Sequence, residues 1–251
     1  MIKHYIIMSS SYTDGGRIAL DITDKLSLNS KAIENIIHEL RDNCGKDVPL
    51  SSHLIETASD SWDSVKEYDP FFDGVICTKS VSDFSEKIKT GRVLSGLDVA
   101  TYILSKLKCT HLSLEKLVYF AYADYLCNYS DRLFEDKIYA FKLGPVVESV
   151  YETFKRSGYK CIESLEQDSG IGLRAGIDEL PVKSRILFTK NGTEKLRSID
   201  QTIKNYGECS ASALVDFTHR KGSPWSKVDS SKEYSIISDD LISKYHYIEC
   251  I

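Results

Sequence analysis

Apolar residues at helical spacing predict two consecutive helices shortly after residue 91. Spacings of three and four residues place each set on one helix face. The two faces carry Leu97, Ala100, Ile103, Leu104 and Leu107, then Leu114, Leu117, Val118, Ala121 and Tyr125. Ser95 and Asp98 have the spacing of a capping box, so the first helix is expected to begin there. Ser113 is the expected N-cap of the second helix.

An alternating pattern follows these two helices. Residues 137–143 place Tyr139, Phe141 and Leu143 on one side, which predicts a short strand. Gly144 and Pro145 come next and favour a strand-to-helix turn, because proline suits the first helical turn. The helix after it is expected to continue to Gly158. Its apolar face carries Val147, Val150, Tyr151 and Phe154.

The last ninety residues alternate between breaker-rich and helical stretches. Residues 163–183, with three glycines, indicate a loop or hairpin, and residues 185–188 a short strand. A helix is expected over 193–206 with its end at Gly207. Ser210 and Ser238 are the expected caps of two further helices.

The first ninety residues predict a small α/β unit. Strands are expected over 3–8 and within 71–78, separated by a loop over 9–16 and a helix over 30–41. A second helix over 82–89 is expected to be capped by Ser82. The pattern makes no prediction for 57–70. The predicted fold class is therefore α+β, with an α/β unit at 1–90 and a mainly helical domain with a short strand or small sheet at 91–251.

Composition narrows the function classes. The chain has 251 residues, 42% of them hydrophobic, and a formal net charge of -5. The hydrophobic fraction excludes a disordered chain. The negative net charge disfavours a protein that binds nucleic acid over its whole surface. The N-terminal apolar run is too short for a secretory signal, so we expect a cytoplasmic protein without membrane segments.

Cysteine and histidine spacing gives no metal or catalytic signature. Seven cysteines and six histidines are scattered, without C-x-x-C or H-E-x-x-H. The glycine pair Gly15-Gly16 lacks the Gly-Lys-Ser/Thr of a phosphate-binding loop. We therefore expect reduced thiols, no metal and no cofactor. An uncharacterised enzyme is the third-ranked function, because nothing selects a Cys–His pair or an acid pair.

The second half contains four motifs in a fixed order: Asp98–Leu104; Leu114–Ala121; Leu133-Phe134 with Ile138–Val146 and Val150–Phe154; and Leu214–His219 with Gly222–Trp225. Together they resemble the Panacea domain, the SocA-like and GepA-like family of antitoxins from phages and mobile elements. The resemblance covers residues 94–227. The chain departs from the family at Glu115, where glutamine is usual, and at Tyr122 and Asp124. These departures are expected at exposed positions of the helix, where they would bear on partner choice.

The resemblance implies a protein that binds and neutralises a toxin by direct contact, and that in some relatives delivers the toxin to a protease. The partner is therefore expected to be a cognate toxin protein. The alternative function is a regulatory protein-binding module, or a proteolytic adaptor, of a phage or mobile element with a different target. If the shared motifs only hold the fold, specificity lies in residues 1–90 and in the loop over 160–183.

The motif residues have both a binding and a structural interpretation. As a partner surface they are Lys116, Tyr119, Lys142, Gly144, Pro145, His219 and Trp225. Free amides of a helix starting at Gly144-Pro145, together with the two lysines, would attract an acidic or polar partner. In the structural interpretation Lys116 snorkels over the core, His219 is a helix cap held by Thr218 or Trp225, and Trp225 plugs the edge of the core.

Basic residues raise DNA binding as a further candidate function. Lys190, Lys195 and Arg197 surround one predicted helix, and Arg220-Lys221 follow later. Charged residues at such spacing usually form a solvated helix face. The net charge of -5 disfavours DNA as a partner.

Overall fold

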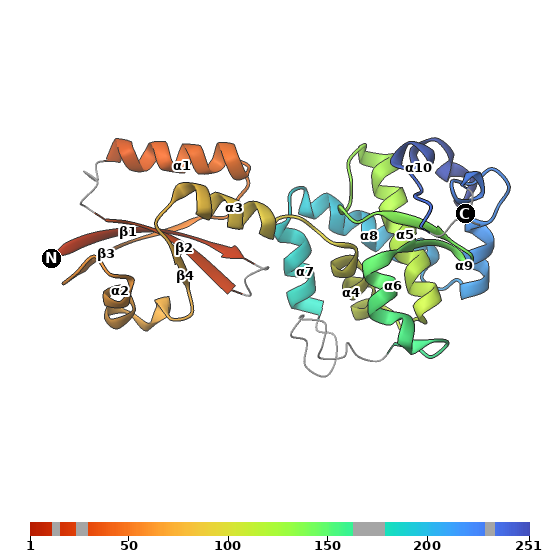
Figure 1. Ribbon diagram of the computed structural model, residues 1–251, viewed down its shortest axis with the longest axis horizontal. Coiled ribbons are helices and arrows are strands. Elements are labelled where there is room, and N and C mark those ends of the chain that lie inside the picture. Colours follow the sequence, from red (N-terminus) through yellow and green to blue (C-terminus); the bar gives the residue numbers. More distant parts are fainter. Residues whose placement is uncertain (12–15, 24–29, 163–178, 229–233) are drawn as a thin grey trace. The chain divides into compact units, whose positions relative to one another are not determined.

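The computed structural model describes residues 1–11, 16–23, 30–162, 179–228 and 234–251, and it is α+β as predicted. The chain forms two compact units, Met1–Val93 and Leu94–Ile251. Each unit has its own core, and each is described by itself below (Figure 1). Among the described residues, no helix has the length and apolar character needed to cross a membrane.

The first unit is built on a mixed sheet, which within the described residues has the order β3-β1-β2-β4. The central strands are β1 (Ile2–Ser11) and β2 (Gly16–Thr23), which run antiparallel. β3 (Ser51–Thr57) is antiparallel to β1, and β4 (Ile76–Thr78) is parallel to β2. The β-branched and apolar residues of β1 are buried on both faces, so both faces must be covered.

Helices cover the two faces of this sheet separately (Figure 1). α1 (Ser30–Cys44) and α3 (Val81–Gly91) pack on one face, where Leu40, Phe84 and Ile88 meet Ile7. α2 (Trp62–Tyr68) and the short turn Pro70–Phe72 cover the other face. Alternate residues of β1 therefore enter two different clusters, as a strand with a period of two requires.

Most elements predicted for the first unit are confirmed, with two corrections. The strand predicted over 3–8 lies within β1, β4 lies within the stretch 71–78 that was predicted to hold a strand, and the predicted helix over 30–41 lies within α1. The predicted loop over 9–16 is wrong at residues 9–11, which extend β1, and at Gly16, which begins β2; residues 12–15 lie outside the described residues. Ser80, not Ser82, caps α3, accepting from the amide of Asp83.

The second unit packs its helices around α5 (His111–Tyr129). α4 (Gly96–Lys106), α8 (Gly192–Tyr206), α9 (Ala211–Thr218) and α10 (Asp239–Tyr245) all contact α5. α6 (Glu148–Phe154) contacts α5, and α7 (Glu179–Phe188) packs between α4 and α8. Every residue from Leu114 to Ala123 is buried, so α5 is the core of the unit rather than an amphipathic surface helix.

A small hairpin lies against α5. β5 (Ile138–Phe141) and β6 (Gly144–Val147) pair antiparallel, joined by Lys142 and Leu143. Residues 235–237 add a short backbone pairing along the other edge of β5. Short 3-10 turns lie at Lys155–Ser157, Trp225–Lys227 and His246–Ile248.

The helix ends of the second unit show which capping predictions hold. The capping box of Ser95 and Asp98 is confirmed, and so are the caps Ser210 and Ser238 and the end of α8 at Gly207. Thr110, not Ser113, caps α5, because the amide of Ser113 donates to the Thr110 hydroxyl.

The strand predicted over 185–188 is wrong, because these residues lie in α7. Val182 and Ile186, four residues apart, lie on one face of this helix and are both buried. Most of the predicted loop or hairpin over 163–183 lies outside the described residues. Its last residues, 179–183, belong to α7 instead.

Candidate functional site

Two adjacent side chains of α5 complete the free edge of β6. The Lys116 ammonium donates to the carbonyl of Pro145, and the Glu115 carboxylate accepts from the amide of Val147 at 3.2 Å. An edge strand carries exactly these unpaired backbone groups, which are costly to bury without partners. Lys116 has no exposed surface at all, so the prediction that it snorkels to the solvent is wrong.

The environment of Lys116 disfavours its charge. Burial lowers the pKa of the ammonium to about 8, although the carboxylates of Glu115 and Glu249 act in the opposite direction. A fully buried lysine with this pKa is a structural device inside the unit. It contributes no positive charge to the surface.

Gly144 and Pro145 form the start of a strand rather than of a helix. Gly144 has a φ of 105° directly after the two-residue hairpin loop, and α6 begins only at Glu148. A Cβ atom on Gly144 would lie 2.8 Å from the Thr218 hydroxyl and 3.1 Å from the Lys116 side chain. The predicted strand-to-helix turn is therefore wrong, and with it the expected anion-binding helix N-terminus.

His219 and Trp225 fasten α9 to the hairpin. Nδ1 of His219 donates to the carbonyl of Val215 at 2.8 Å, and the two rings lie 3.7 Å apart between centroids. The indole of Trp225 donates to the carbonyl of Phe141 at 2.8 Å. The prediction that His219 is a cap held by Thr218 or Trp225 is confirmed, and Trp225 packs against the main core as predicted.

Tyr119 is an internal residue. Its hydroxyl donates to the Glu249 carboxylate at 2.7 Å, and burial, with that charge, raises its pKa well above the ordinary value. Val118 and Phe154 are buried as predicted, whereas Phe217 is only partly buried against the core. Glu115 and Tyr122 are also buried, so the prediction that the departures from the family pattern are exposed is wrong for these two.

The structure thus divides the seven predicted partner residues. Lys116, Tyr119, Gly144 and Pro145 are buried, His219 and Trp225 are partly buried, and Lys142 is exposed. Burial removes Lys116 and Tyr119 from direct contact with a partner. A binding role for Lys142, His219 and Trp225 stays a prediction.

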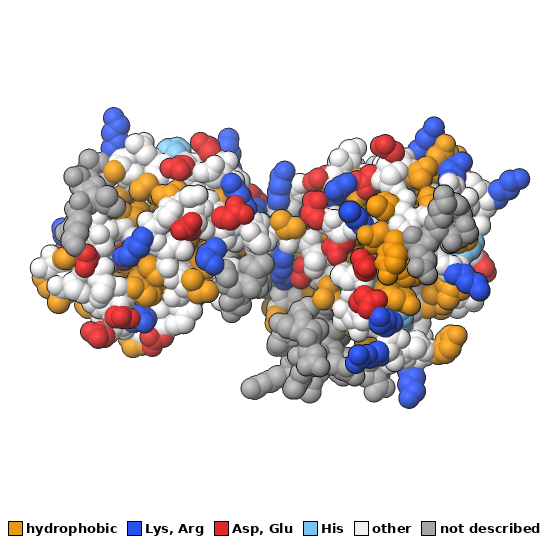
Figure 2. Space-filling view, viewed as in Figure 1, with side chains coloured by type: hydrophobic (Ala, Val, Ile, Leu, Met, Phe, Trp, Pro, Cys, Tyr) orange, Lys and Arg blue, Asp and Glu red, His pale blue; other side chains and the backbone are white. Residues whose placement is uncertain are grey.

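The outward face of the hairpin carries an aromatic surface whose residues were not among the seven predicted partner residues. It consists of Tyr139, Phe141, Tyr151 and Tyr234, and we call it the aromatic face. Phe141 lies 5.2 Å from Tyr151 and 5.8 Å from Tyr234, and Tyr139 lies 5.5 Å from Tyr234, between ring centroids. Figure 2 shows hydrophobic side chains gathered over the hairpin. Leu143 and Ile236, each about half exposed, extend this apolar surface.

Acidic residues line one side of the aromatic face. A surface pocket of about 390 Å³ next to Tyr139 is lined by Asp136, Glu148 and Glu152, with Lys137 and Ser149. Asp136 is tied down, because it accepts from the amide of Gly96 and the hydroxyl of Ser149. Glu148 at the start of α6 and Glu152 one turn later are exposed, and Lys155 pairs with Glu152. The three carboxylates outnumber Lys137 and Lys155, so the rim carries a small excess of negative charge beside a hydrophobic surface.

A buried polar cluster in the first unit links a carboxylate, an imidazole and a hydroxyl in series, as a catalytic triad does, but it is closed to solvent. Nδ1 of His4 contacts Asp21 at 2.9 Å, and Nε2 contacts the Thr57 hydroxyl at 3.0 Å. Lys79 pairs with Asp21 as well. The Thr57 hydroxyl donates to the carbonyl of Ser59 at 2.6 Å, and both His4 and Thr57 are buried within the sheet. The cluster links strands and offers no open nucleophile.

Comparison with known proteins defines the class of the second unit. Residues 114–226 match the family described as Antitoxin SocA-like, Panacea domain. Residues 114–226 of the second unit therefore match a SocA-like Panacea domain. The resemblance is confirmed for the three motifs from Leu114 onward, and the first motif, Asp98–Leu104, lies outside the matched residues.

One curated relative is the Antitoxin SocA of Caulobacter vibrioides (strain NA1000 / CB15N). It is 29% identical over 134 residues, which cover 51% of this chain. The match spans 66% of that protein, just under two thirds of its length. No solved structure matches the chain.

Proposed function

We propose that the protein is an antitoxin that binds a toxin protein by direct contact and neutralises it without turnover. The observation that carries the proposal is the Panacea domain at residues 114–226, together with similarity to a protein named as an antitoxin. The proposal places both partners in the cytoplasm and their genes side by side on a phage or mobile element. The free cysteines of the described residues agree with a reducing compartment.

The aromatic face is the proposed contact surface. Tyrosine and phenylalanine supply large contact areas at little cost in side-chain entropy, and they are frequent anchors of protein interfaces. Lys142 and Leu143 at the tip of the hairpin lie next to this face and are exposed. The toxin is unable to extend the sheet at β6, because Glu115 and Lys116 already occupy that edge. Binding therefore uses side chains of the hairpin's outer surface.

The charge of the rim defines the chemistry of the partner. Glu148 and Glu152 lie beside the aromatic face, and the positive charge expected from Lys116 is buried. The toxin is thus proposed to present apolar residues flanked by lysine or arginine. This replaces the acidic or polar partner expected from the sequence. Rim charges mainly accelerate association, whereas central aromatic residues slow dissociation.

The test measures protection and affinity with the toxin encoded by the adjacent gene. Tyr139→Ala and Phe141→Ala should each weaken binding by more than about 1 kcal/mol, and Glu148→Lys with Glu152→Lys should reduce the association rate at low salt. Tyr247→Ala and Phe71→Ala are matched controls, since both aromatic residues are exposed outside this face. Growth rescue should follow affinity across the series.

Two outcomes separate the alternatives. If the Phe71 control in the first unit loses binding while the hairpin variants bind normally, specificity lies in residues 1–90, as the competing interpretation holds. If the adjacent product is not toxic but still binds the aromatic face, the protein is a regulatory module. A proteolytic adaptor predicts in addition that the bound partner disappears faster in cells with an intact protease.

A further inference from the structure

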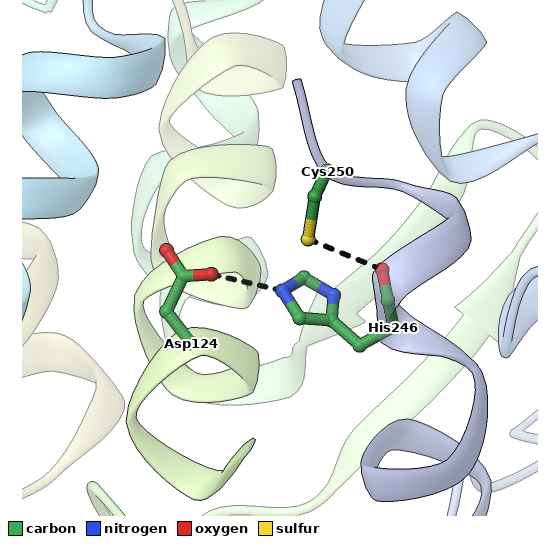
Figure 3. A group of neighbouring side chains, drawn as sticks. All are labelled: Asp124, His246 and Cys250. Atoms are coloured by element: carbon green, nitrogen blue, oxygen red, sulfur yellow. Dashed lines mark hydrogen bonds and ion pairs between the residues drawn. The ribbon is translucent and has the colours of Figure 1, made fainter. Parts of the chain in front are cut away.

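A second polar cluster, in the second unit, combines nitrogen, oxygen and sulfur atoms that are able to bind a metal ion. Asp124 on α5, His246 in the turn after α10, and Cys250 four residues later each offer one ligand atom. These three atoms lie within 4.8 Å of one another (Figure 3). Asp124 is partly exposed and Cys250 is exposed, so the cluster opens to solvent.

The histidine is oriented by a buried carboxylate. Nε2 of His246 faces Asp124 at 2.9 Å, while Nδ1 faces Glu249 at 2.9 Å. Glu249 is fully buried, and the Tyr119 hydroxyl donates to the same carboxylate oxygen at 2.7 Å. Histidines that ligate metals usually donate their second ring nitrogen to such a carboxylate, which fixes the ring and raises its basicity.

We propose that Asp124, His246 and Cys250 bind a zinc-class divalent cation, with Glu249 as the positioning residue for His246. Carboxylate oxygen, imidazole nitrogen and thiolate sulfur are the ligand types that Zn²⁺ takes. The ion replaces the proton between Asp124 and His246, and Cys250 binds as the thiolate. Binding therefore releases one proton from Nε2 and one from the thiol. The fourth position faces solvent and takes water.

The same geometry disfavours a cysteine nucleophile. A Cys–His pair needs a ring nitrogen free to accept the thiol proton, but both nitrogens of His246 face carboxylates. The Cys250 thiol instead donates to the backbone carbonyl of His246 at 3.4 Å. A metal ion meets no such obstacle, because Asp124 is itself a ligand. Sequence spacing predicted no metal site, since Asp124 lies 122 residues from His246.

The test is zinc binding to the purified full-length chain after treatment with a chelator. Competition with a chromogenic chelator should show one zinc bound per chain, with affinity that falls as the pH falls. Asp124→Asn and Cys250→Ser should weaken binding at least tenfold. Glu249→Gln should weaken it about 10- to 100-fold, as expected for a group that orients a ligand. Cobalt should give a thiolate charge-transfer band that Cys250→Ser abolishes.

Matched controls keep the outcome clear. Cys161→Ser and Asp216→Asn change an exposed thiol and an exposed carboxylate elsewhere in the same unit, and should leave zinc affinity unchanged. Circular dichroism checks that each variant is folded. The proposal is wrong if the wild-type chain binds no zinc at micromolar concentration. It is equally wrong if folded Asp124→Asn and Cys250→Ser variants both bind as the wild type does.

Discussion

The two faces of the β5–β6 hairpin differ in which residues they bury: charged groups are buried on the face toward α5, and aromatic residues lie on the outward face. The face toward α5 covers Lys116 and Glu115 of that helix, while the outward face carries the half-buried rings of Tyr139 and Phe141. The charged pair is internal because each group satisfies one backbone atom of β6. The aromatic residues are external because the inward positions of β5 are taken by Ile138 and Ala140. Motif residues are therefore mostly structural here, and the surface available to a partner lies next to them.

Replacing phenylalanine with alanine once in the core and once on the aromatic face should give the largest difference in the loss of stability. Phe154→Ala removes a ring that is 3% exposed and should cost about 3–5 kcal/mol of stability. Phe141→Ala, at a half-buried position on the aromatic face, should cost less than about 1 kcal/mol. Denaturant unfolding measures both. Equal losses would mean that the aromatic face belongs to the core.

The buried lysine should make stability depend on pH. Burial lowers the folded-state pKa of Lys116 to about 8, so between pH 8 and 10 the folded chain has lost a proton that the unfolded chain keeps. Stability contributed by this group therefore rises with pH in that window, by about 2–3 kcal/mol.

Lys116→Met isolates this contribution, because it removes the titrating group and keeps a long side chain. The stability of the wild type minus that of the variant should grow between pH 8 and 10 and stay flat from pH 6 to 7. A difference independent of pH across the whole range would show that Lys116 is not buried in solution.

Gly144 tests how closely the motif segments approach one another. Gly144→Ala should cost about 1–3 kcal/mol, because φ is 105° and the new methyl group meets Thr218. Gly158→Ala is the control, since Gly158 has a φ of 56° but no atom within 4 Å of the added Cβ. Thermal melting measures the stability that each variant loses. Equal losses would mean that backbone strain alone, without the contact with Thr218, accounts for the effect at Gly144.

Glu115→Gln should have the smallest effect, below about 1 kcal/mol. The amide oxygen of glutamine still accepts from the Val147 amide, while the contact with His111 at 3.3 Å and the Coulombic attraction to Lys116 weaken. Glu115→Ala leaves that amide without its partner and should cost about 1–3 kcal/mol. Chemical denaturation compares the two; a larger loss for glutamine than for alanine would contradict the proposed sealing of the β6 edge.

The sequence was sufficient to predict an element wherever its structure depends on residues within about one turn of each other. The capping box at Ser95 needs only residues three apart, and the alternation of β5 needs only its own side chains. β6 was missed because Gly144-Pro145 also reads as a helix start. What excludes that alternative is pairing with β5 and contact with α5, which the local pattern does not contain.

The candidate surfaces depend even more on distant contacts. Alternation placed Tyr139 and Phe141 together, but Tyr151 and Tyr234 reach the same face from α6 and from the segment after Val228. The inward direction of Lys116 follows from its contact with Pro145, 29 residues away. Asp124, His246 and Cys250 meet only when the last turn docks on α5.

The sealed edge of β6 also has a consequence for the order of folding. A two-stranded hairpin is marginal alone, and its open edge is a template for pairing with another chain. The groups that cover this edge, Glu115 and Lys116, precede their backbone partners in β6 by 32 and 29 residues. During synthesis from the N-terminus, α5 is therefore available before the hairpin emerges. The residues that prevent β6 from pairing with a strand of another chain are therefore synthesised before β6 itself.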